Sequence, residues 1–545
     1  MKETRMKKRV NRLVAWVGVL VLWAGAAQGA ELPRVARTQG ASQLIVDGKP
    51  YVIFGGELGN SSAGTEAQAD AVLPRLAALH VNTVLMPVAW DQLEPREGSY
   101  DFRLLDHWID VARAQRMHLV LLWFGSWKNS FSEYAPSWVK TDVRRFPRVR
   151  GIDGAPLEIL STFGEETLRL DAKAFAALMA HLRAKDKQQT VLMVQVENEV
   201  GVLGERRDRS EPANRAFNAD VPASLVQALQ ARRNAMTPEL AVHFNPQGHT
   251  WKDVFGDAAD EVFMAWRYAT YIDAVAAAGK AQYALPMYLN VQLPAPQERA
   301  GEYPSGGSHP YFQPVYQAVA SHIDFYSPDI YWPDFAYWVQ RYQALGNPVF
   351  VPEARLEAGP YNALYLYGEA RGFGFSPFDI DSLPAPGNDA ASSPLLMQVY
   401  GELRDLGDML PTAQVDGRTR GLVLHATSPR PTQTVALGGY LFEGTLSRSW
   451  PARTLETQDG AMLVLQSSPD EFYLVGTGLT VTIRRDPDVD ARVAGIDSIE
   501  EVSRHGDTWQ TLRRLNGDQS NQGRQLMMDP HNAHVYRVRV HAIER

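Results

Sequence analysis

Cysteine is absent from this chain of 545 residues. Its absence excludes disulfides, thiolate metal sites and a cysteine nucleophile. Basic residues are also outnumbered, 54 Lys and Arg against 62 Asp and Glu, which gives a formal net charge of -8. Nucleic-acid binding requires a basic stripe, so we expect no nucleic acid among the partners. Mild acidity of this size indicates solubility rather than a partner, and the composition predicts no oligomeric state.

Long apolar runs are rare, and the one that stands out lies near the N-terminus, from Leu13 to Ala27. It follows a basic start and precedes the small residues around Gly29, which is the three-part layout of a secretory signal peptide. The alternative is a membrane anchor, but the run is shorter than the ~20 residues that a spanning helix needs. We therefore predict a signal peptide over residues 1–30, no stable membrane span after its cleavage, and export to the periplasm or the medium.

The segment from about residue 40 to 380 alternates between short β-branched or aromatic runs and stretches rich in Ala, Leu and Arg. This alternation is typical of parallel α/β folds, and eight repeats favour a (β/α)₈ TIM barrel. An open doubly wound sheet would show a glycine-rich phosphate loop after its first strand, and Gly55-Gly56 is too short for one. The predicted strands are Tyr51–Phe54, Thr83–Pro87, His118–Phe124, Thr190–Glu197, Pro286–Val291, Ile323–Tyr326, Pro348–Pro352 and Gly372–Ser376.

The sequence pattern changes after about residue 415, where short runs of alternating apolar and polar residues are separated by turn residues and helical stretches are scarce. Such a pattern predicts an all-β domain with a sandwich-like arrangement. We therefore predict a catalytic barrel over residues 31–380, a linker or helical junction over 381–415, and a β-rich C-terminal domain over 416–545.

The strongest local signal is the sequence Met-Val-Gln-Val-Glu-Asn-Glu over residues 193–199. Side chains of a strand alternate between its two faces, so Gln195, Glu197 and Glu199 are expected to face the barrel interior. Glu199 comes last, at the C-terminal rim where barrel enzymes hold their catalytic groups. A solvated edge strand would be the alternative, but the run is too apolar for one.

A second carboxylate, Glu353, ends the seventh predicted strand in the sequence Pro-Val-Phe-Val-Pro-Glu-Ala-Arg over residues 348–355. Many strands end in Glu, and an ion pair with Arg355 would be a purely structural alternative. Together with Glu199, however, Glu353 provides the two carboxylates that glycoside hydrolysis needs, one as acid and one as nucleophile. The neighbouring charge is expected to raise the pKa of the acid, and Arg355 to keep the nucleophile ionised.

Aromatic residues at or just after strand ends support a carbohydrate ligand, because flat apolar sugar faces stack on such rings. Core packing is the alternative for each of them singly. The aromatic candidates are Trp90, Trp123, Trp127, Trp266, Tyr331, Trp332, Phe373 and Phe375. No histidine pair has matching acidic ligands on strands, so we expect neither a metal nor any other cofactor.

These segments resemble glycoside hydrolase family 35, the β-galactosidase family. Residues 195–201, Gln-Val-Glu-Asn-Glu-Val-Gly, are similar to its Q-V-E-N-E-Y-G signature. Residues 90–102, which begin with Trp90, are similar to its W-N-x-H-E-P-x-x-G-x-Y-D-F segment, and Gly55-Gly56-Glu57-Leu58 to its entry strand. The resemblance implies that Glu199 is the acid/base and Glu353 the nucleophile. It also implies that Asn198 contacts the hydroxyl next to the reacting carbon.

The chain departs from this family at the sugar contacts. Gly59-Asn60-Ser61-Ser62 stands where the family has His-Tyr-x-Arg, and a family glutamate that holds sugar hydroxyls falls at Phe131. We therefore expect Trp127 and Asn129 to replace missing contacts, with Glu57, Asn198, Tyr331 and Trp90 as the other substrate-binding residues. Such departures, with the β-rich C-terminal part, resemble a divergent bacterial branch.

The sequence thus predicts an exported retaining exo-β-galactosidase that removes terminal β-D-galactosyl residues from oligosaccharides and polysaccharides of plant cell-wall type. Two alternatives stay open. One is a β-glycosidase of the same fold with another specificity, such as an arabinosidase, a glucosidase or an endo-glycanase. The other is a non-catalytic carbohydrate-binding protein, in which the glutamates only hold hydroxyls.

Overall fold

The computed structural model describes residues 31–38, 40–384, 394–489 and 492–544. Apart from Glu31, they belong to one unit that runs from Leu32 to Arg545. The predicted signal peptide over residues 1–30 lies outside the described residues. In the part of the chain that is described, no helix has both the length and the apolar character required to cross a bilayer.

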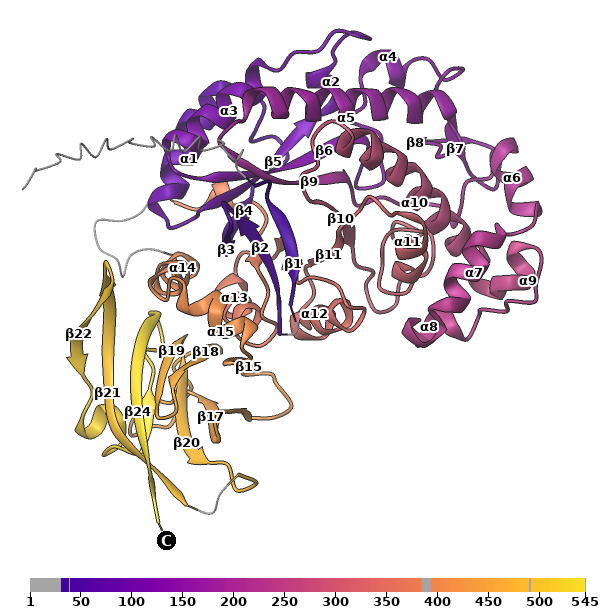
Figure 1. Ribbon diagram of the computed structural model, residues 1–545. Coiled ribbons are helices and arrows are strands. Elements are labelled where there is room, and N and C mark those ends of the chain that lie inside the picture. The colour runs from indigo at the N-terminus through magenta and orange to yellow at the C-terminus, as the bar shows by residue number, and fades with distance from the viewer. Residues whose placement is uncertain (1–30, 39, 385–393, 490–491, 545) are drawn as a thin grey trace, which may run out of the picture. The chain divides into compact units, whose positions relative to one another are not determined.

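Parallel strands close into a barrel (Figure 1). The order of the strands is β12-β14-β4-β5-β6-β9-β10-β11-β13, and every neighbouring pair is parallel. The two ends of this order, β12 (Phe350–Val351) and β13 (Glu353–Ala354), are halves of one strand interrupted at Pro352, so the sheet closes on itself. Because two of the nine segments are halves of one strand, the barrel has eight strands, which confirms the predicted fold. The other strands are β4 (Ile53–Glu57), β5 (Thr83–Ala89), β6 (His118–Lys128), β9 (Val191–Asn198), β10 (Met287–Gln292), β11 (Phe325–Ile330) and β14 (Gly374–Phe375).

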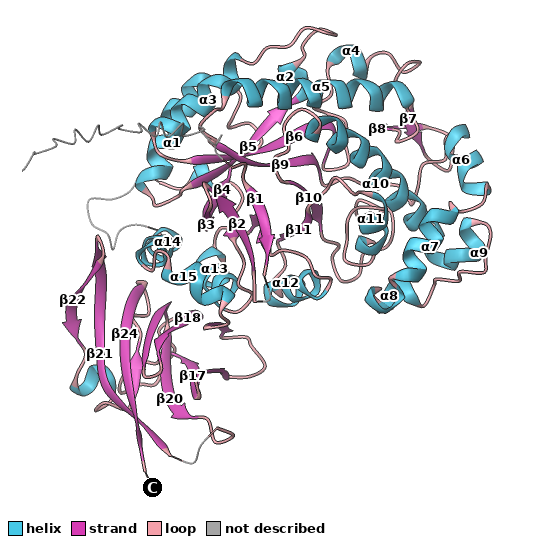
Figure 2. Ribbon diagram, in the orientation of Figure 1, coloured by secondary structure: helices cyan, strands magenta, loops and turns pink. Residues whose placement is uncertain are grey.

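Helices connect the barrel strands and cover them, as the cyan ribbons of Figure 2 show. Helix α3 illustrates why: Leu105, Trp108, Ile109 and Ala112 recur at helical spacing and form its buried face. The helices are α1 (Glu66–Ala78), α2 (Trp90–Leu93), α3 (Arg103–Ala114), α4 (Ser137–Lys140), α5 (Glu165–Lys185), α6 (Glu211–Asn218), α7 (Ala223–Ala231), α8 (Pro238–Ala241), α9 (Trp251–Phe255), α10 (Ala259–Lys280), α11 (Gln313–Val319), α12 (Phe335–Ala344), α13 (Gly359–Gly368), α14 (Leu395–Asp405) and α15 (Met409–Val415).

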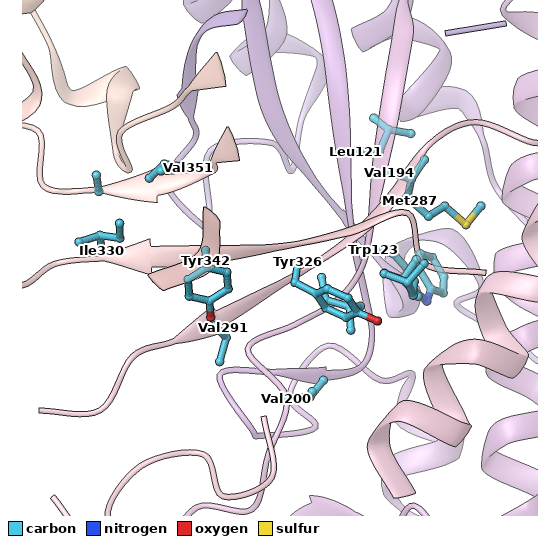
Figure 3. Packing of buried hydrophobic residues seen from close by; sticks show 14 of the residues in the cluster. Leu121, Trp123, Val194, Val200, Met287, Val291, Tyr326, Ile330, Tyr342 and Val351 are labelled. Carbon is cyan, nitrogen blue, oxygen red and sulfur yellow. The ribbon is translucent and has the colours of Figure 1, made fainter. Parts of the chain in front are cut away.

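Alternate residues of each barrel strand face opposite sides. On β6, Leu121 and Trp123 belong to the cluster under the helices, and Figure 3 shows them near Val194 and Met287 of the neighbouring strands. Leu122 and Phe124 belong to a second cluster inside the barrel. The barrel is therefore filled at its centre, and a site can form only at a rim.

A three-stranded antiparallel sheet that the sequence did not predict precedes the barrel. It consists of β1 (Arg34–Arg37), β2 (Ser42–Val46) and β3 (Lys49–Tyr51). Leu44 and Val46 of β2 join the cluster inside the barrel. Since β3 directly precedes the first barrel strand, this sheet closes the N-terminal end of the barrel and leaves the C-terminal rim for function.

The C-terminal part is antiparallel, which confirms the predicted β domain. One sheet has the order β15-β18-β19-β24-β21-β22 and the other β16-β17-β20-β23. A separate two-stranded sheet, β7-β8, lies between α4 and α5 in the chain. The strands are β7 (Arg148–Arg150), β8 (Pro156–Leu160), β15 (Thr419–His425), β16 (Thr432–Leu437), β17 (Tyr440–Leu446), β18 (Asp459–Ser468), β19 (Glu471–Thr477), β20 (Leu479–Arg485), β21 (Val493–His505), β22 (Thr508–Arg514), β23 (Gln525–Met527) and β24 (His534–Ile543).

Strand β18 is buried on both faces. Met462 and Val464 belong to the core between the two C-terminal sheets, whereas Leu463 and Leu465 belong to the core of the barrel helices. The six-stranded sheet contacts α13 through β15 and β18. At the closest approach, a Cβ on Gly368 would lie 2.5 Å from the carbonyl oxygen of Arg420, so only glycine fits there.

The helices α14 and α15 lie within the predicted junction of residues 381–415. Tyr400 of α14 donates its hydroxyl hydrogen to the carbonyl oxygens of Gly55 (2.9 Å) and Phe375 (3.0 Å) in the neighbouring strands β4 and β14. Helix α14 therefore covers the barrel as the helix after its eighth strand. The residue boundaries of the predicted domains stay a prediction.

Candidate active site

Three carboxylates from separate barrel strands converge at the C-terminal rim. Glu199 directly follows β9, Asp329 lies near the end of β11, and Glu353 begins β13. One oxygen of each lies within 4.8 Å of the other two, and all three side chains are buried. Retaining glycosidases hold two carboxyl groups ~5–5.5 Å apart, whereas inverting enzymes separate them by ~6.5–9.5 Å. The spacing of Glu199 and Glu353 therefore fits the retaining geometry.

Glu199 is held from three sides. Its Oε2 accepts a hydrogen bond from Nδ2 of Asn129 at 2.6 Å, and its backbone N–H donates to Oδ1 of Asn290 at 3.0 Å. The backbone N–H of Ser130 donates to its carbonyl oxygen at 3.1 Å. Burial and, secondarily, the charge of Glu353 raise the pKa of Glu199 to about 7. A carboxyl group with such a pKa holds its proton near neutral pH, as a general acid must.

Glu353 accepts two hydrogen bonds. The hydroxyl of Tyr331 donates to Oε2 at 2.8 Å, and Nδ2 of Asn290 donates to Oε1 at 3.2 Å. The same Nδ2 donates to Oδ2 of Asp329 at 2.8 Å. Asn290 of β10 thus connects all three carboxylate-bearing residues. Both oxygens of Glu353 are therefore held in a fixed orientation.

The cation that faces these carboxylates is Lys128, not Arg355 as the sequence suggested. The guanidinium of Arg355 is exposed and donates through Nε to the carbonyl oxygen of Tyr331 at 2.6 Å. Lys128 at the end of β6 is buried, with its ammonium 5.2 Å from the centre of the Phe124 ring. Burial alone would lower the pKa of Lys128, but the charges of Glu353, Glu199, Glu57 and Asp329 together raise it.

The carboxyl groups of Glu57 and Asp329 also interact electrostatically with the Lys128 ammonium. Glu57 ends β4 and is fully buried, and its pKa is raised first by burial and then by Glu353. The pKa of Asp329 is likewise raised by burial, then by Glu353 and Glu199. Both groups therefore hold a proton more tightly than ordinary carboxylates do.

Several polar atoms of the site have no protein partner. Among the described residues, this holds for both amide atoms of Asn198, whereas the carboxyl groups of Glu57 and Asp329 interact with those of Glu353 and Glu199. Buried polar groups of folded proteins are normally hydrogen-bonded, so each of these atoms calls for an explanation. Sugar hydroxyls, which donate and accept, would provide the missing hydrogen bonds.

Two predicted substrate contacts belong to the core instead. The indole of Trp127 is fully buried, donates to the carbonyl oxygen of Leu160 at 3.0 Å and packs against the rings of Tyr268 and Tyr271. Trp90 is fully buried as well, and its indole donates to Oε2 of Glu94 at 2.8 Å. Both rings fill space between strands and helices, so neither can stack on a sugar.

Glu197 is not an inward-facing neighbour of Glu199, because the alternation of β9 breaks before its end. The backbone of Glu197 is left-handed (φ 61°), and its Oε2 accepts a hydrogen bond from the backbone N–H of Trp127 at 2.8 Å. Burial and the charge of Asp171 on α5 raise its pKa. Glu199 (φ 44°), Asn129 (φ 50°) and Ser130 (φ 69°) are also left-handed. Such conformations of non-glycine residues are unfavourable and cluster at functional sites.

The site is also the place where a cation would fit, if one bound. Glu199, Asp329 and Glu353 form the one group of metal-ligating side chains that converges in the described part of the chain. Asn290 and Tyr331 already donate to two of these carboxylates. Since Lys128 adds a positive charge, these donors and the ammonium meet the electrostatic needs that a metal ion would otherwise meet.

The sequence predicted six residues of this rim, which are Glu57, Asn129, Asn198, Glu199, Tyr331 and Glu353. It missed the side chains of Lys128, Asn290 and Asp329. A signal existed for Asn290 and Asp329, because each lies late in a predicted or observed strand, where rim residues are expected. The amide of Asn129 does not face an open position, because it donates to Glu199.

Two family models match the chain. Residues 62–233 match the family described as Glyco_hydro_42, Beta-galactosidase, and residues 396–527 match a Domain of unknown function, DUF5597. The first of these matches covers three of the barrel strands, β5, β6 and β9, and includes Glu199, but not Asp329 or Glu353. Residues 62–233 are thus similar to the β-galactosidases of family 42, and the matching model is not that of family 35. No curated protein sequence matches the chain.

Solved structures of similar fold include a catalytic mutant of a family 42 β-galactosidase from G. stearothermophilus, with 11% identity and a TM-score of 0.47 over 90% of this chain and 98% of that one. A β-galactosidase from Bacillus circulans sp. alkalophilus has 14% identity and a TM-score of 0.45, over 66% of this chain and 57% of that one. An endo-1,4-β-mannanase from Eisenia fetida has 14% identity and a TM-score of 0.41, over 68% of this chain and 95% of that one. The chain thus spans little more than half the length of the Bacillus enzyme.

Proposed function

We propose that the protein is an exported, exo-acting β-galactosidase that removes terminal β-D-galactosyl residues from plant-type oligosaccharides and polysaccharides with retention of configuration. The observation that carries this proposal is the convergence of Glu199 and Glu353, whose nearest oxygens lie within 4.8 Å. Galactose as the sugar is supported by the family 42 match over residues 62–233. The family 35-like signature over residues 195–201 supports the same sugar and a place near that family.

In the first step, the ionised Glu353 attacks the anomeric carbon while Glu199 gives its proton to the leaving oxygen. The C–O bond of the glycoside breaks, and an ester bond between Glu353 and the sugar forms. The roles follow from the surroundings of the two carboxyl groups. Glu199 has a pKa of about 7 and can carry a proton, whereas Glu353 accepts hydrogen bonds from Tyr331 and Asn290.

In the second step, the now ionised Glu199 removes a proton from water, and the resulting hydroxide attacks the anomeric carbon. The ester bond breaks, Glu353 regains its charge, and the sugar leaves with its original configuration. When the ester forms, Glu353 loses its negative charge, which lowers the pKa of Glu199 because that charge raised it. The change in charge therefore turns the acid of the first step into the base of the second.

The sugar itself would be held by the buried polar groups of the rim. We propose that Asn198, Glu57 and Asp329 bind its hydroxyls, with the Lys128 ammonium beside them. In the described residues, no hydrogen bond or ion pair of the Lys128 ammonium with a protein group is found. A sugar hydroxyl can accept from that ammonium without displacing an existing contact.

The decisive experiment is a panel of aryl β-glycosides that differ only in the sugar, with the anomeric configuration of the first product followed by NMR. We expect the galactoside to react fastest and to give the β-anomer first. A first product with inverted configuration would overturn the double displacement. Faster turnover of a glucoside or an arabinoside would overturn the sugar assignment and leave the catalytic pair in place.

Export is a separate part of the proposal, supported by the basic, apolar and small-residue segments of residues 1–30. Mass spectrometry of the protein purified from its native host should show a mature N-terminus near Glu31. An intact Met1 on the mature protein would overturn cleavage.

A further inference from the structure

The chain reverses direction directly after β6, in a turn formed by residues 128–131. The backbone N–H of Lys128 donates to the carbonyl oxygen of Phe131 at 2.8 Å, and the N–H of Phe131 donates back to Lys128 at 3.1 Å. Asn129 and Ser130 between them are both left-handed. Two left-handed central residues define a type I′ turn, the usual two-residue reversal of a β-hairpin. We call residues 128–131 the rim turn.

Both central residues of the rim turn donate hydrogen bonds to Glu199. The amide of Asn129 donates to its carboxylate at 2.6 Å, and the N–H of Ser130 donates to its carbonyl oxygen at 3.1 Å. Left-handed Asn and Ser are less favourable than glycine, so these contacts offset a backbone that would otherwise relax. The position of the rim turn relative to Glu199 is therefore fixed.

The pairing geometry sets the direction of the Phe131 side chain. Residues that exchange two backbone hydrogen bonds face each other across a hairpin, and their side chains lie on the same side. Lys128 and Phe131 are such a pair, and the Lys128 ammonium lies near enough to Glu353, Glu199, Glu57 and Asp329 for their charges to raise its pKa. The Phe131 ring therefore lies beside Lys128 on the face of the turn that borders the site.

The Phe131 ring is partly open to solvent. It is 40% exposed, while the neighbouring Lys128 and Ser130 are buried. A large apolar ring held at the edge of a polar site leaves an apolar surface open for a ligand.

We propose that Phe131 forms a wall of the leaving-group subsite, where its ring stacks on the apolar face of the sugar or aryl group that the cleavage releases. This inference rests on the proposed function, because it takes Glu199 as the acid. An acid must reach the leaving oxygen, so the leaving group lies on the Glu199 side of the cleaved bond. The rim turn is hydrogen-bonded to Glu199, and it brings Phe131 to the Glu199 side of the cleaved bond. Phe131 thus selects substrates by the group that departs and not by the terminal sugar.

The test compares two substrates that carry the same glycosyl group. One is the β-glycosyl fluoride, whose leaving group has no ring, and the other is a β-linked disaccharide. The value kcat/KM includes only steps up to release of the leaving group, so its ratio between the two substrates isolates contacts with that group. The variants are Phe131→Ala and Phe131→Trp. The control is Leu512→Ala, which removes an exposed apolar side chain (54% exposed) from the edge strand β22, at the end of its sheet opposite β15.

We expect Phe131→Ala to lower the ratio of disaccharide to fluoride kcat/KM about tenfold, through a higher KM for the disaccharide. Phe131→Trp should restore the ratio, since a larger ring also stacks, and Leu512→Ala should leave it at the wild-type value. An unchanged ratio in Phe131→Ala, or a Phe131→Trp ratio as low as that of alanine, would overturn the subsite and leave the proposed function standing. Failure of the wild-type enzyme to hydrolyse either substrate would overturn the proposed function and the subsite with it.

Discussion

The hydroxyl of Tyr331 donates to Oε2 of Glu353 at 2.8 Å, although the two residues leave different barrel strands. Glu353 begins β13, and Tyr331 directly follows β11, which pairs with β13 in parallel. The hydrogen bond fixes one carboxylate oxygen, and Asn290 holds the other. The proposed nucleophile is therefore oriented before any substrate binds, as electrostatic preorganisation requires.

The first prediction concerns Glu353→Gln. An amide cannot form the ester intermediate, so kcat should fall by about 10⁴-fold or more. The side chain keeps its size and can still accept from Tyr331, so the unfolding temperature should stay close to that of the wild type. Steady-state kinetics with an aryl glycoside and circular dichroism during heating measure the two effects. Activity above about a tenth of the wild-type value would remove Glu353 from the nucleophile role.

The second prediction concerns Glu199→Ala, which removes the proposed acid/base. A substrate whose leaving group needs no proton, such as a dinitrophenyl glycoside, should still form the glycosyl-enzyme, whose breakdown then limits the rate. Added azide should speed that breakdown and yield the β-glycosyl azide, because a small anion fits where the carboxylate was and needs no base. Product analysis by NMR identifies the azide. Absence of both the adduct and the rescue would argue against Glu199 as acid/base.

The third prediction concerns pH. Glu199 must be protonated in the first step, and its pKa is raised to about 7, so kcat/KM should fall as the pH rises through about 7. The charge of Lys128 lowers this pKa. Its removal in Lys128→Met should therefore raise the pKa of Glu199 and move the high-pH decrease of kcat/KM, the alkaline limb, to higher pH. Lys128→Arg keeps the charge and should leave this limb at its wild-type pH. A shift of this limb to lower pH in Lys128→Met would contradict the electrostatic role of Lys128.

The fourth prediction concerns Asn290, which holds the backbone of Glu199 and the side chains of Asp329 and Glu353. Misplacement of reacting groups by about 1 Å can lower a rate about 10²-fold. We expect Asn290→Ala to lower kcat by about 10²-fold while KM changes less, because the substrate-binding atoms remain. Steady-state kinetics separate the two parameters. An effect on KM alone would show that Asn290 binds substrate instead.

The sequence was sufficient to predict the barrel because its periodicity is local. Each predicted strand overlaps an observed one, and the positions of Glu199 and Glu353 at strand ends were sufficient to assign both to the rim. Lys128 and Asn290 could not be assigned in this way. Their roles depend on which groups the neighbouring strands bring near them, and one sequence does not reveal those distances.

Other errors have local causes. Strand parity placed Glu197 in the interior, but one left-handed residue reversed the alternation. Trp90 and Trp127 end up in the core because helices and loops from distant parts of the chain cover them. Arg355 is two positions from Glu353, yet sequence proximity beyond a strand end does not set side-chain direction.

The fifth prediction concerns the two-faced strand β18. Leu463 is fully buried and belongs to the cluster of the barrel helices. Its replacement by alanine leaves a cavity, so we expect Leu463→Ala to reduce the free energy of unfolding by about 2–5 kcal/mol. Leu512→Ala on the exposed edge should change it by less than about 0.5 kcal/mol. Urea denaturation followed by fluorescence measures both, and equal stability of the two variants would contradict the packing role of Leu463.

The double-sided burial of β18 has a consequence for ancestry. Domains joined by a flexible linker each have their own hydrophobic core and can fold alone. Here the matched DUF5597 region starts at Leu396 in α14, and the sheet that follows covers α13, which begins six residues after Glu353. Separation would expose apolar surface on both fragments, next to the helix that follows Glu353 in the chain. We therefore expect related proteins to retain the barrel and the C-terminal sheets together. A substitution on one side of their shared core should be accompanied by a compensating substitution on the other side.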